Sequence, residues 1–181
     1  MATFCTKQSI RIARPTDFDA VTALLMASYS NLLTSRYDGD TLKRALPYLG
    51  RTNPTLLACG TFYLVEGEPD GLVGCGGWTV ADPISGESVE GEAHIRHFAI
   101  HPHWTRRGIG TCVLTRCFDD TLSFGIHKLH CMATLNAEQF YRAAGFVTVR
   151  SFDVPMGPSL TFPCILMRRE TRYIQRSQFP S

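Results

Sequence analysis

The chain has 181 residues, of which 44% are hydrophobic and 19% are charged, and these proportions are typical of a single globular domain. Its formal net charge of +2 is nearly balanced, so composition gives no support for a nucleic-acid surface, which usually has a clustered basic face. No apolar run approaches the roughly 20 residues that span a bilayer, and residues 1–14 lack the apolar core of a signal peptide.

Seven cysteines are scattered along the chain, and none of them forms the CxxC spacing of a zinc site. Most lie within apolar stretches, where a free cysteine packs as a small hydrophobic residue. This usage predicts no metal site and favours a reducing, cytoplasmic location. The seven residues are Cys5, Cys59, Cys75, Cys112, Cys117, Cys131 and Cys164.

The first quarter of the chain predicts a strand followed by two helices. Alternating apolar residues at 10–12 indicate a short strand, which Pro15 ends. Thr16 is placed to cap a helix whose apolar stripe continues to Leu32. After a polar break, a second and shorter helix is expected over 41–49.

The next segment predicts a β-hairpin. Two β-rich runs, 61–65 and 72–80, are separated by a glycine- and proline-containing turn at 67–71. The glycines within 74–77 weaken the second strand and indicate either a bulge or the close approach of another backbone. Residues 81–91 are expected to form a polar loop.

The second half of the chain alternates strands with helices, which predicts an α/β domain with a mixed sheet covered on both faces. The last residues, 171–181, form a polar tail without a clear structural pattern. The expected strands are 94–100, 128–133, 147–154 and 161–168, and the expected helices are 108–124 and 136–144.

Between the strand at 94–100 and the next helix lies a basic, glycine-containing turn. The N–H groups at a helix start have no partner within the helix, and the helix dipole adds positive charge there. Gly108 and Gly110 would let a phosphate approach the backbone, and Arg106 and Arg107 add fixed positive charge. The segment therefore predicts a diphosphate site, although an ordinary solvated turn would show the same pattern.

The same turn resembles the pyrophosphate-binding motif of the GNAT superfamily of N-acetyltransferases, Gln/Arg-x-x-Gly-x-Gly/Ala. Residues 105–110, Thr-Arg-Arg-Gly-Ile-Gly, match both glycines, whereas Thr105 replaces the usual Gln or Arg. The resemblance implies acetyl-CoA as the co-substrate. The residues that it implies for acetyl-CoA binding are Phe98, Ala99, Ile100, Thr105, Arg106, Arg107, Gly108, Ile109, Gly110, Thr111, Asn136 and Tyr141.

Residues 136–146, Asn-Ala-Glu-Gln-Phe-Tyr-Arg-Ala-Ala-Gly-Phe, resemble a second GNAT motif, Asn-x-x-Ala-x-x-x-Tyr-x-x-x-Gly-Phe. Tyr141 falls in register, and the resemblance implies that it protonates the departing CoA thiolate. Asn136 lies two residues after the family's asparagine position, which Thr134 occupies. Asn136 is therefore expected either to contact the CoA arm or to cap the short helix.

The two motifs together imply a single GNAT-like domain over 1–170 with a mostly antiparallel sheet flanked by helices. An amine with a pKa of about 10.4 must lose a proton before it attacks a thioester, so a base is needed. His94 stands where the histone-acetylating branch has a glutamate, and a histidine pKa of about 6.5 suits this role. Water is the alternative base, and Glu92 and His97 are weaker alternatives.

Strict alternation along the strand predicts one face carrying His94, Arg96, Phe98 and Ile100 and another carrying Ile95, His97 and Ala99. The resemblance implies that the N–H of Ile100, or of a neighbour within 98–100, polarises the thioester carbonyl.

We therefore expect an acetyl-CoA-dependent N-acetyltransferase in which a primary amine attacks directly in a ternary complex. The alternatives are a non-catalytic acyl-CoA-binding sensor or interaction module and a generic nucleotide-binding domain. The presence of Tyr141 favours the enzyme over a non-catalytic acyl-CoA-binding module. The motif at 136–146 argues against a generic nucleotide-binding domain, which would not explain it. The acceptor is not identified, although the resemblance places its site between 29–38 and 155–162. The expected partners are acetyl-CoA and this amine, a homodimer is allowed, and neither nucleic acid nor membrane is expected.

Overall fold

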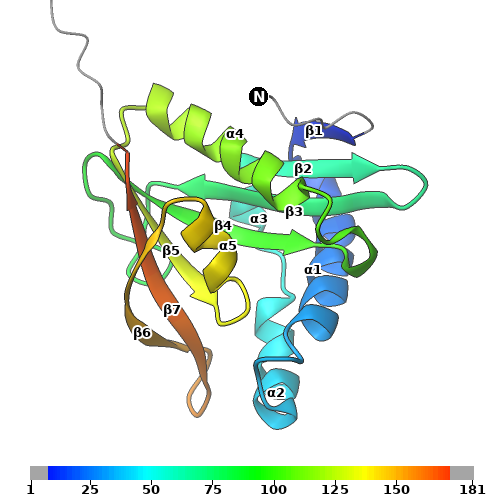
Figure 1. The fold of residues 1–181 in the computed structure, drawn as a ribbon. Helices are drawn as coiled ribbons and strands as arrows, with labels where there is room; N and C mark the ends of the chain where they lie inside the picture. Colours follow the sequence, from blue (N-terminus) through cyan, green and yellow to red (C-terminus); the bar gives the residue numbers. More distant parts are fainter. Residues whose placement is uncertain (1–7, 172–181) are drawn as a thin grey trace, which may run out of the picture.

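The computed structural model describes residues 8–171 and contains one seven-stranded sheet with helices on both of its faces (Figure 1). Residues 1–7 and 172–181, which include Cys5 and nearly all of the predicted tail, lie outside the described residues. The strands are β1 (Gln8–Ile12), β2 (Phe62–Gly67), β3 (Gly71–Thr79), β4 (Glu92–Ile100), β5 (Lys128–Thr134), β6 (Val147–Pro155) and β7 (Thr161–Glu170). Their order in the sheet is β1-β2-β3-β4-β5-β7-β6, and every neighbouring pair is antiparallel except β4 and β5.

The helices are α1 (Phe18–Leu32), α2 (Gly39–Leu49), α3 (Pro54–Ala58), α4 (Ile109–Ser123) and α5 (Glu138–Ala143). Helices α4 and α5 cover one face of the sheet, with Val113 and Tyr141 in the same buried cluster as Leu129 of β5. Helices α1 and α3 cover the other face, where Leu25 and Leu57 pack against β2. This arrangement confirms the predicted mixed α/β fold. No helix between residues 8 and 171 is long and apolar enough to cross a membrane.

The start of α1 differs from the prediction that Thr16 caps it. Residues Pro15–Asp17 form a 3-10 turn, and Asp17 occupies the N-cap position. The Asp17 carboxylate pairs with the Arg11 guanidinium at 2.8 Å and accepts the N–H of Arg14 at 2.7 Å. These two contacts fix the turn against β1, so the helix begins after Asp17 rather than after Thr16.

The short helix α3 was missed because five residues cannot display an amphipathic period. Its start nevertheless carries a local signal, since Asn53 accepts the N–H of Thr55 at 2.9 Å and Pro54 occupies the first helical position.

The glycines of β3 lie opposite a bulge in β4, which confirms the predicted irregularity. Gly77 pairs with Arg96 and Cys75 pairs with Ala99, so two residues of β4 oppose Gly76 alone. One of the two, His97, has a φ of 45°. The other, Phe98, places its ring where a side chain at position 76 would lie, so that a Cβ there would be 2.5 Å from the ring.

The bulge makes the predicted division of β4 into two faces wrong. Ile95, Phe98 and Ile100 all pack against the cluster beneath α4 and α5, whereas Ala99 belongs to the cluster beneath α1. An extra residue in a strand reverses the alternation of side chains from that point onward. His94 therefore faces away from Phe98 and Ile100 rather than sharing a face with them.

Candidate functional site

Strands β4 and β5 pair only at their beginnings and then diverge. Their parallel register ends at His94 and His130, after three residue pairs. Strand β5 continues to pair with β7 as far as Thr134 opposite Cys164, whereas within residues 8–171 β4 has no further strand partner on that side. The sheet therefore contains a wedge at its centre, which exposes backbone groups of β4 to a ligand.

Helix α1 reaches the edge of β4 that borders this wedge. The N–H of Ile100 donates to the hydroxyl of Ser28 at 3.3 Å, and the hydroxyl of Tyr29 donates to the carbonyl of Phe98 at 3.4 Å. Ser28 is buried. No sequence signal distinguished this serine from the other residues of the helix, so its contact with the predicted donor Ile100 could be found only in the structure.

A tight turn connects β4 to α4. It contains two positive φ angles, 60° at Arg106 and 79° at Gly108, and Gly108 is the N-cap of the helix. The guanidinium of Arg107 lies 4.6 Å above the ring of Trp104, and the hydroxyl of Thr105 donates to the carbonyl of Pro102 at 3.2 Å. A Cβ at position 108 would have no atom within 4 Å, so the space in front of the helix is open.

The N-terminus of α4 has unpaired donors next to this open space. The helix's first hydrogen bond runs from the N–H of Cys112 to the carbonyl of Gly108 at 2.9 Å, so the N–H groups of Ile109, Gly110 and Thr111 precede it. The Ile109 side chain is buried, whereas Arg106 and Arg107 are exposed. Free N–H groups, a helix dipole and two arginines form an arrangement that can bind a phosphate or diphosphate.

The structure brings Tyr141 next to β4. Its ring makes an edge contact with Phe98, with the ring centroids 6.1 Å apart, and similar contacts with Phe140 and Phe146. Tyr141 is buried, and this burial raises the pKa of its phenol well above 10. The hydroxyl therefore remains protonated at neutral pH and is able to donate a hydrogen bond or a proton.

Asn136 does not cap α5, so that alternative is wrong. The helix begins at Glu138 and its N-cap is Ala137. The Asn136 amide instead donates to the carbonyl of Leu32, at the C-terminal end of α1, at 3.3 Å. It thereby connects the segment after β5 to the first helix.

The two segments predicted to bound an acceptor site lie against each other. The ring of Tyr37, between α1 and α2, stacks on Phe162 of β7 with a centroid separation of 4.3 Å. The Tyr37 hydroxyl donates to the carbonyl of Pro163 and accepts the N–H of Leu135, each at 2.8 Å. Tyr37 therefore links the end of β5 to β7, and Asp38 caps α2. Both residues have structural roles.

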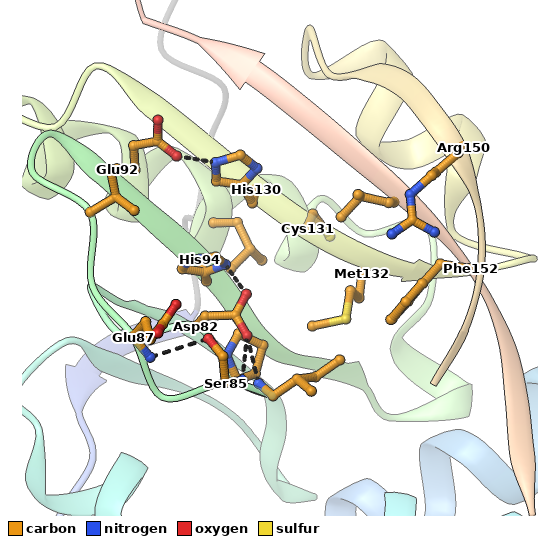
Figure 2. A pocket seen from close by; sticks show the side chains of 15 residues that line it. Asp82, Ser85, Glu87, Glu92, His94, His130, Cys131, Met132, Arg150 and Phe152 are labelled. Atoms are coloured by element: carbon orange, nitrogen blue, oxygen red, sulfur yellow. Dashed lines mark hydrogen bonds and ion pairs between the residues drawn. The ribbon is translucent and has the colours of Figure 1, made fainter. Parts of the chain in front are cut away.

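A cavity of about 320 Å³ lies at the closed end of the wedge (Figure 2). His94, His130 and Met132 line it together with Ile95 and Cys131. Along β5, His130 and Met132 alternate with Leu129 and Cys131, which belong to the cluster beneath α4, and His94 of β4 is the register partner of His130. The cavity is therefore on the opposite face of the sheet from α4. Its remaining walls are the polar loop 81–91 and residues of β6 and β7.

His94 lines this cavity between His130 and Asp82. Its ring stacks on His130 at a centroid separation of 5.1 Å, and its Nδ1 lies 3.6 Å from a carboxylate oxygen of Asp82 (Figure 2). Burial lowers the pKa of His94 below its usual 6.5. The imidazole is therefore neutral near pH 7 and can accept a proton.

The two weaker base candidates are placed less favourably. Glu92 is held by Lys128 and by Nε2 of His130, and the hydrogen bond from Lys128 contributes most to lowering its pKa. Burial lowers the pKa of His97 to about 4, which makes it a weak base at neutral pH. The structure thus brings four titratable groups together in the cavity, namely Glu92, His94, His130 and Asp82. The last two were not identified from the sequence.

The histidines after β4 do not belong to this cavity. The rings of His101 and His103 contact each other edge to face, with centroids 5.2 Å apart, beside the turn that precedes α4. Between residues 8 and 171, no group of three or more His, Cys, Asp or Glu side chains is arranged to hold a metal ion.

Comparison with known proteins identifies the chain's relatives. The pattern of the acetyltransferase (GNAT) domain family matches residues 58–148, which is half of the chain. A GCN5-related N-acetyltransferase structure from Rhodopseudomonas palustris is similar with a TM-score of 0.74 and 16% identity, covering 94% of this chain and all of that one. No curated protein matches the chain.

Two further solved structures share the fold. The PaiA N-acetyltransferase of Thermoplasma acidophilum, in complex with coenzyme A, has a TM-score of 0.68 and 12% identity over 92% of this chain and 100% of that one. The ribosomal-protein-S18-alanine N-acetyltransferase of Escherichia coli has a TM-score of 0.62 and 13% identity over 95% and 99%. At these identities the similarity establishes a common fold.

Proposed function

Because the chain belongs to the GNAT family of acetyltransferases, we propose that it moves the acetyl group of acetyl-CoA to a primary amine by direct attack in a ternary complex. The observation that supports this proposal most strongly is that the edge of β4 which has no strand partner after His94 among residues 8–171 leads directly into the N-terminus of α4. One segment, 94–111, thereby provides both backbone groups at the wedge and an anion site beside it.

The anion site fits the diphosphate of acetyl-CoA. The N–H groups of Ile109, Gly110 and Thr111 and the side chains of Arg106 and Arg107 would hold it, and the absence of a side chain at Gly108 leaves the approach open. The PaiA structure, which shares the fold, contains coenzyme A. Acetyl-CoA supplies the acyl group as an activated thioester.

Backbone groups of β4 would stabilise the negative charge that develops on the carbonyl oxygen. The N–H of Ile100 is available for this role, because its bond to Ser28 is long, at 3.3 Å, and can be exchanged. Ser28 then acts as the acceptor that keeps this N–H satisfied in the free enzyme. Loss of one such donor typically costs about 10²- to 10³-fold in kcat.

Two side chains would handle the protons. Tyr141, whose phenol is kept protonated by burial, donates a proton to the departing sulfur. His94, which is neutral and lines the cavity on the opposite face of the sheet, accepts the proton of the amine through Nδ1 or Nε2. A water molecule in the cavity is the alternative acceptor of this proton, and substitution of His94 distinguishes the two.

The proposal is tested by following release of the CoA thiol with a panel of primary amines. We expect release to depend on the amine, with double-reciprocal plots that intersect because both substrates are bound at once. Parallel plots would indicate a covalent acetyl-enzyme and exclude direct attack. Tight acetyl-CoA binding without amine-dependent release would instead support the acyl-CoA-binding sensor or interaction module.

A further inference from the structure

The charges around the cavity are divided between two sides. Asp82 and Glu87 belong to the loop 81–91 and lie on the same side as His94, whereas Arg150 extends from β6 on the other side (Figure 2). A cavity of about 320 Å³ has the volume of roughly ten liquid water molecules and lies at the small end of ligand sites. It therefore suits a small molecule with separated charges.

The acidic side can receive an ammonium group. Asp82 accepts the N–H groups of Ile84 and Ser85 at 2.8 and 2.9 Å, which fixes its carboxylate beside His94. Glu87 is exposed at the rim of the cavity. A protonated amine that approaches His94 would thus be attracted by the carboxylates of Glu87 and Asp82 before it transfers its proton.

The basic side consists of one arginine without a carboxylate partner among residues 8–171. The guanidinium of Arg150 lies 4.8 Å above the ring of Phe152, and its hydrogen bond to the carbonyl of Ser151 is long, at 3.5 Å. Stacking on an aromatic ring restrains the guanidinium while leaving its N–H groups available. A planar fork of N–H donors binds a carboxylate with two parallel hydrogen bonds.

Apolar side chains separate the two charged sides. Met132 of β5 and Phe152 of β6 lie between His94 and Arg150 in Figure 2, and Leu166 of β7 also lines the cavity. A ligand that spans this region would place an apolar body against them, with its charged groups at either end.

We propose that the acceptor is a small amino carboxylate, such as an apolar amino acid, whose amine lies at His94 and whose carboxylate is bound by Arg150. This inference rests on the proposed acetyl transfer and assigns Arg150 as the residue that determines acceptor specificity. A peptide or protein amine would lack the carboxylate that Arg150 needs.

The test compares amino acids with their amides, for example leucine with leucinamide and methionine with methioninamide, in wild type and Arg150→Gln. The amide keeps the shape of the acceptor and removes its negative charge. We expect Arg150→Gln to lower kcat/KM for the amino acids by about 10- to 100-fold, mainly through KM, as loss of a charge-assisted hydrogen bond predicts. Activity with the amides should change little, and comparing ratios between the two enzymes cancels differences in amine pKa.

Arg116→Gln is the matched control. Arg116 also lies over an aromatic ring, Tyr63, at 5.2 Å, but it belongs to α4 and does not line the cavity. We expect it to leave the ratio of amino acid to amide activity unchanged. The melting temperature of both variants checks that the fold is retained.

Three results would overturn the inference while leaving acetyl transfer intact. Equal losses with amino acids and amides in Arg150→Gln would remove the specificity role of Arg150. A higher kcat/KM with amines that lack a carboxylate than with any amino carboxylate would exclude small amino carboxylates as the substrate class. A preference for peptide N-termini or lysine side chains would exclude them as well. Absence of thiol release with every amine would instead refute the proposed function itself.

Discussion

Replacement of Gly108 by asparagine or aspartate separates charge from shape at the predicted diphosphate site. Both side chains enter open space, because no atom lies within 4 Å of a Cβ at this position. Both must adopt the φ of 79° that glycine has here. We therefore expect each variant to lose about 1 kcal/mol of folding free energy, the cost of a left-handed conformation for an L-residue.

The two variants differ by one negative charge at the end of α4. A carboxylate roughly 5 Å from a phosphate charge is repelled by about 1–2 kcal/mol in an exposed setting, where the effective dielectric lies between those of protein and water. Gly108→Asp should therefore bind CoA about 5- to 30-fold more weakly than Gly108→Asn. Gly108→Asp should nevertheless be the more stable of the two variants, because an aspartate is favourable near the positive end of a helix.

Calorimetric titration of each variant with CoA measures this difference, and urea unfolding measures the stabilities. The affinity gap should narrow in concentrated salt, which screens exposed charges. Equal affinities of the two variants for CoA, with both folded, would show that no phosphate charge lies near position 108. The assignment of the α4 N-terminus as the diphosphate site would then be refuted.

Three further substitutions address the proton transfers and the bulge. Tyr141→Phe should lower kcat by about 10²- to 10⁴-fold with little change in CoA affinity, and full activity would leave Tyr141 with a packing role only. His94→Gln should slow turnover near neutrality but less at high pH, where more of the amine is neutral. If wild type and His94→Gln have equal rates and parallel pH profiles with the same acceptor, water rather than His94 takes the proton of the amine. His97 has a folded-state pKa of about 4, so the folded protein binds a proton more weakly than the unfolded chain and stability is lost as pH falls below 6.5. Protonation of His97 alone should therefore cost wild type about 2 kcal/mol between pH 7.5 and 5, so that in urea unfolding His97→Asn, which tolerates the positive φ, should lose about that much less than wild type over this range. An equal pH dependence of the two proteins would contradict the burial argument.

Local patterns in the sequence predicted the strands, the longer helices and the turn before α4, whereas the five-residue helix α3 and the N-cap of α1 were not predicted correctly. The turn that ends in Gly108 requires a positive φ directly before a helix, and glycine is the residue that adopts it most easily. The glycines of β3 likewise indicated an irregularity, and Gly76 is needed because the Phe98 ring occupies the space of its side chain.

The features that the sequence did not reveal depend on residues far apart in the chain. The bulge at His97 reverses the faces of β4, and it can be located only from the register with β3. The cavity combines His94 of β4 with Asp82 of the preceding loop and Arg150 of β6, three segments that come together only when the sheet forms. Ser28 reaches Ile100 across 72 positions, and no local periodicity reports such a contact.

In the proposed reaction, an acetyl group passes from acetyl-CoA to an amine held beside His94. The most direct measurement is mass spectrometry of the product after the purified protein is incubated with isotopically labelled acetyl-CoA and an amine from the panel. We expect a labelled acetyl group on the nitrogen of the amine, formed in step with free CoA. Consumption of acetyl-CoA that yields only labelled acetate, with every amine unmodified, would contradict it.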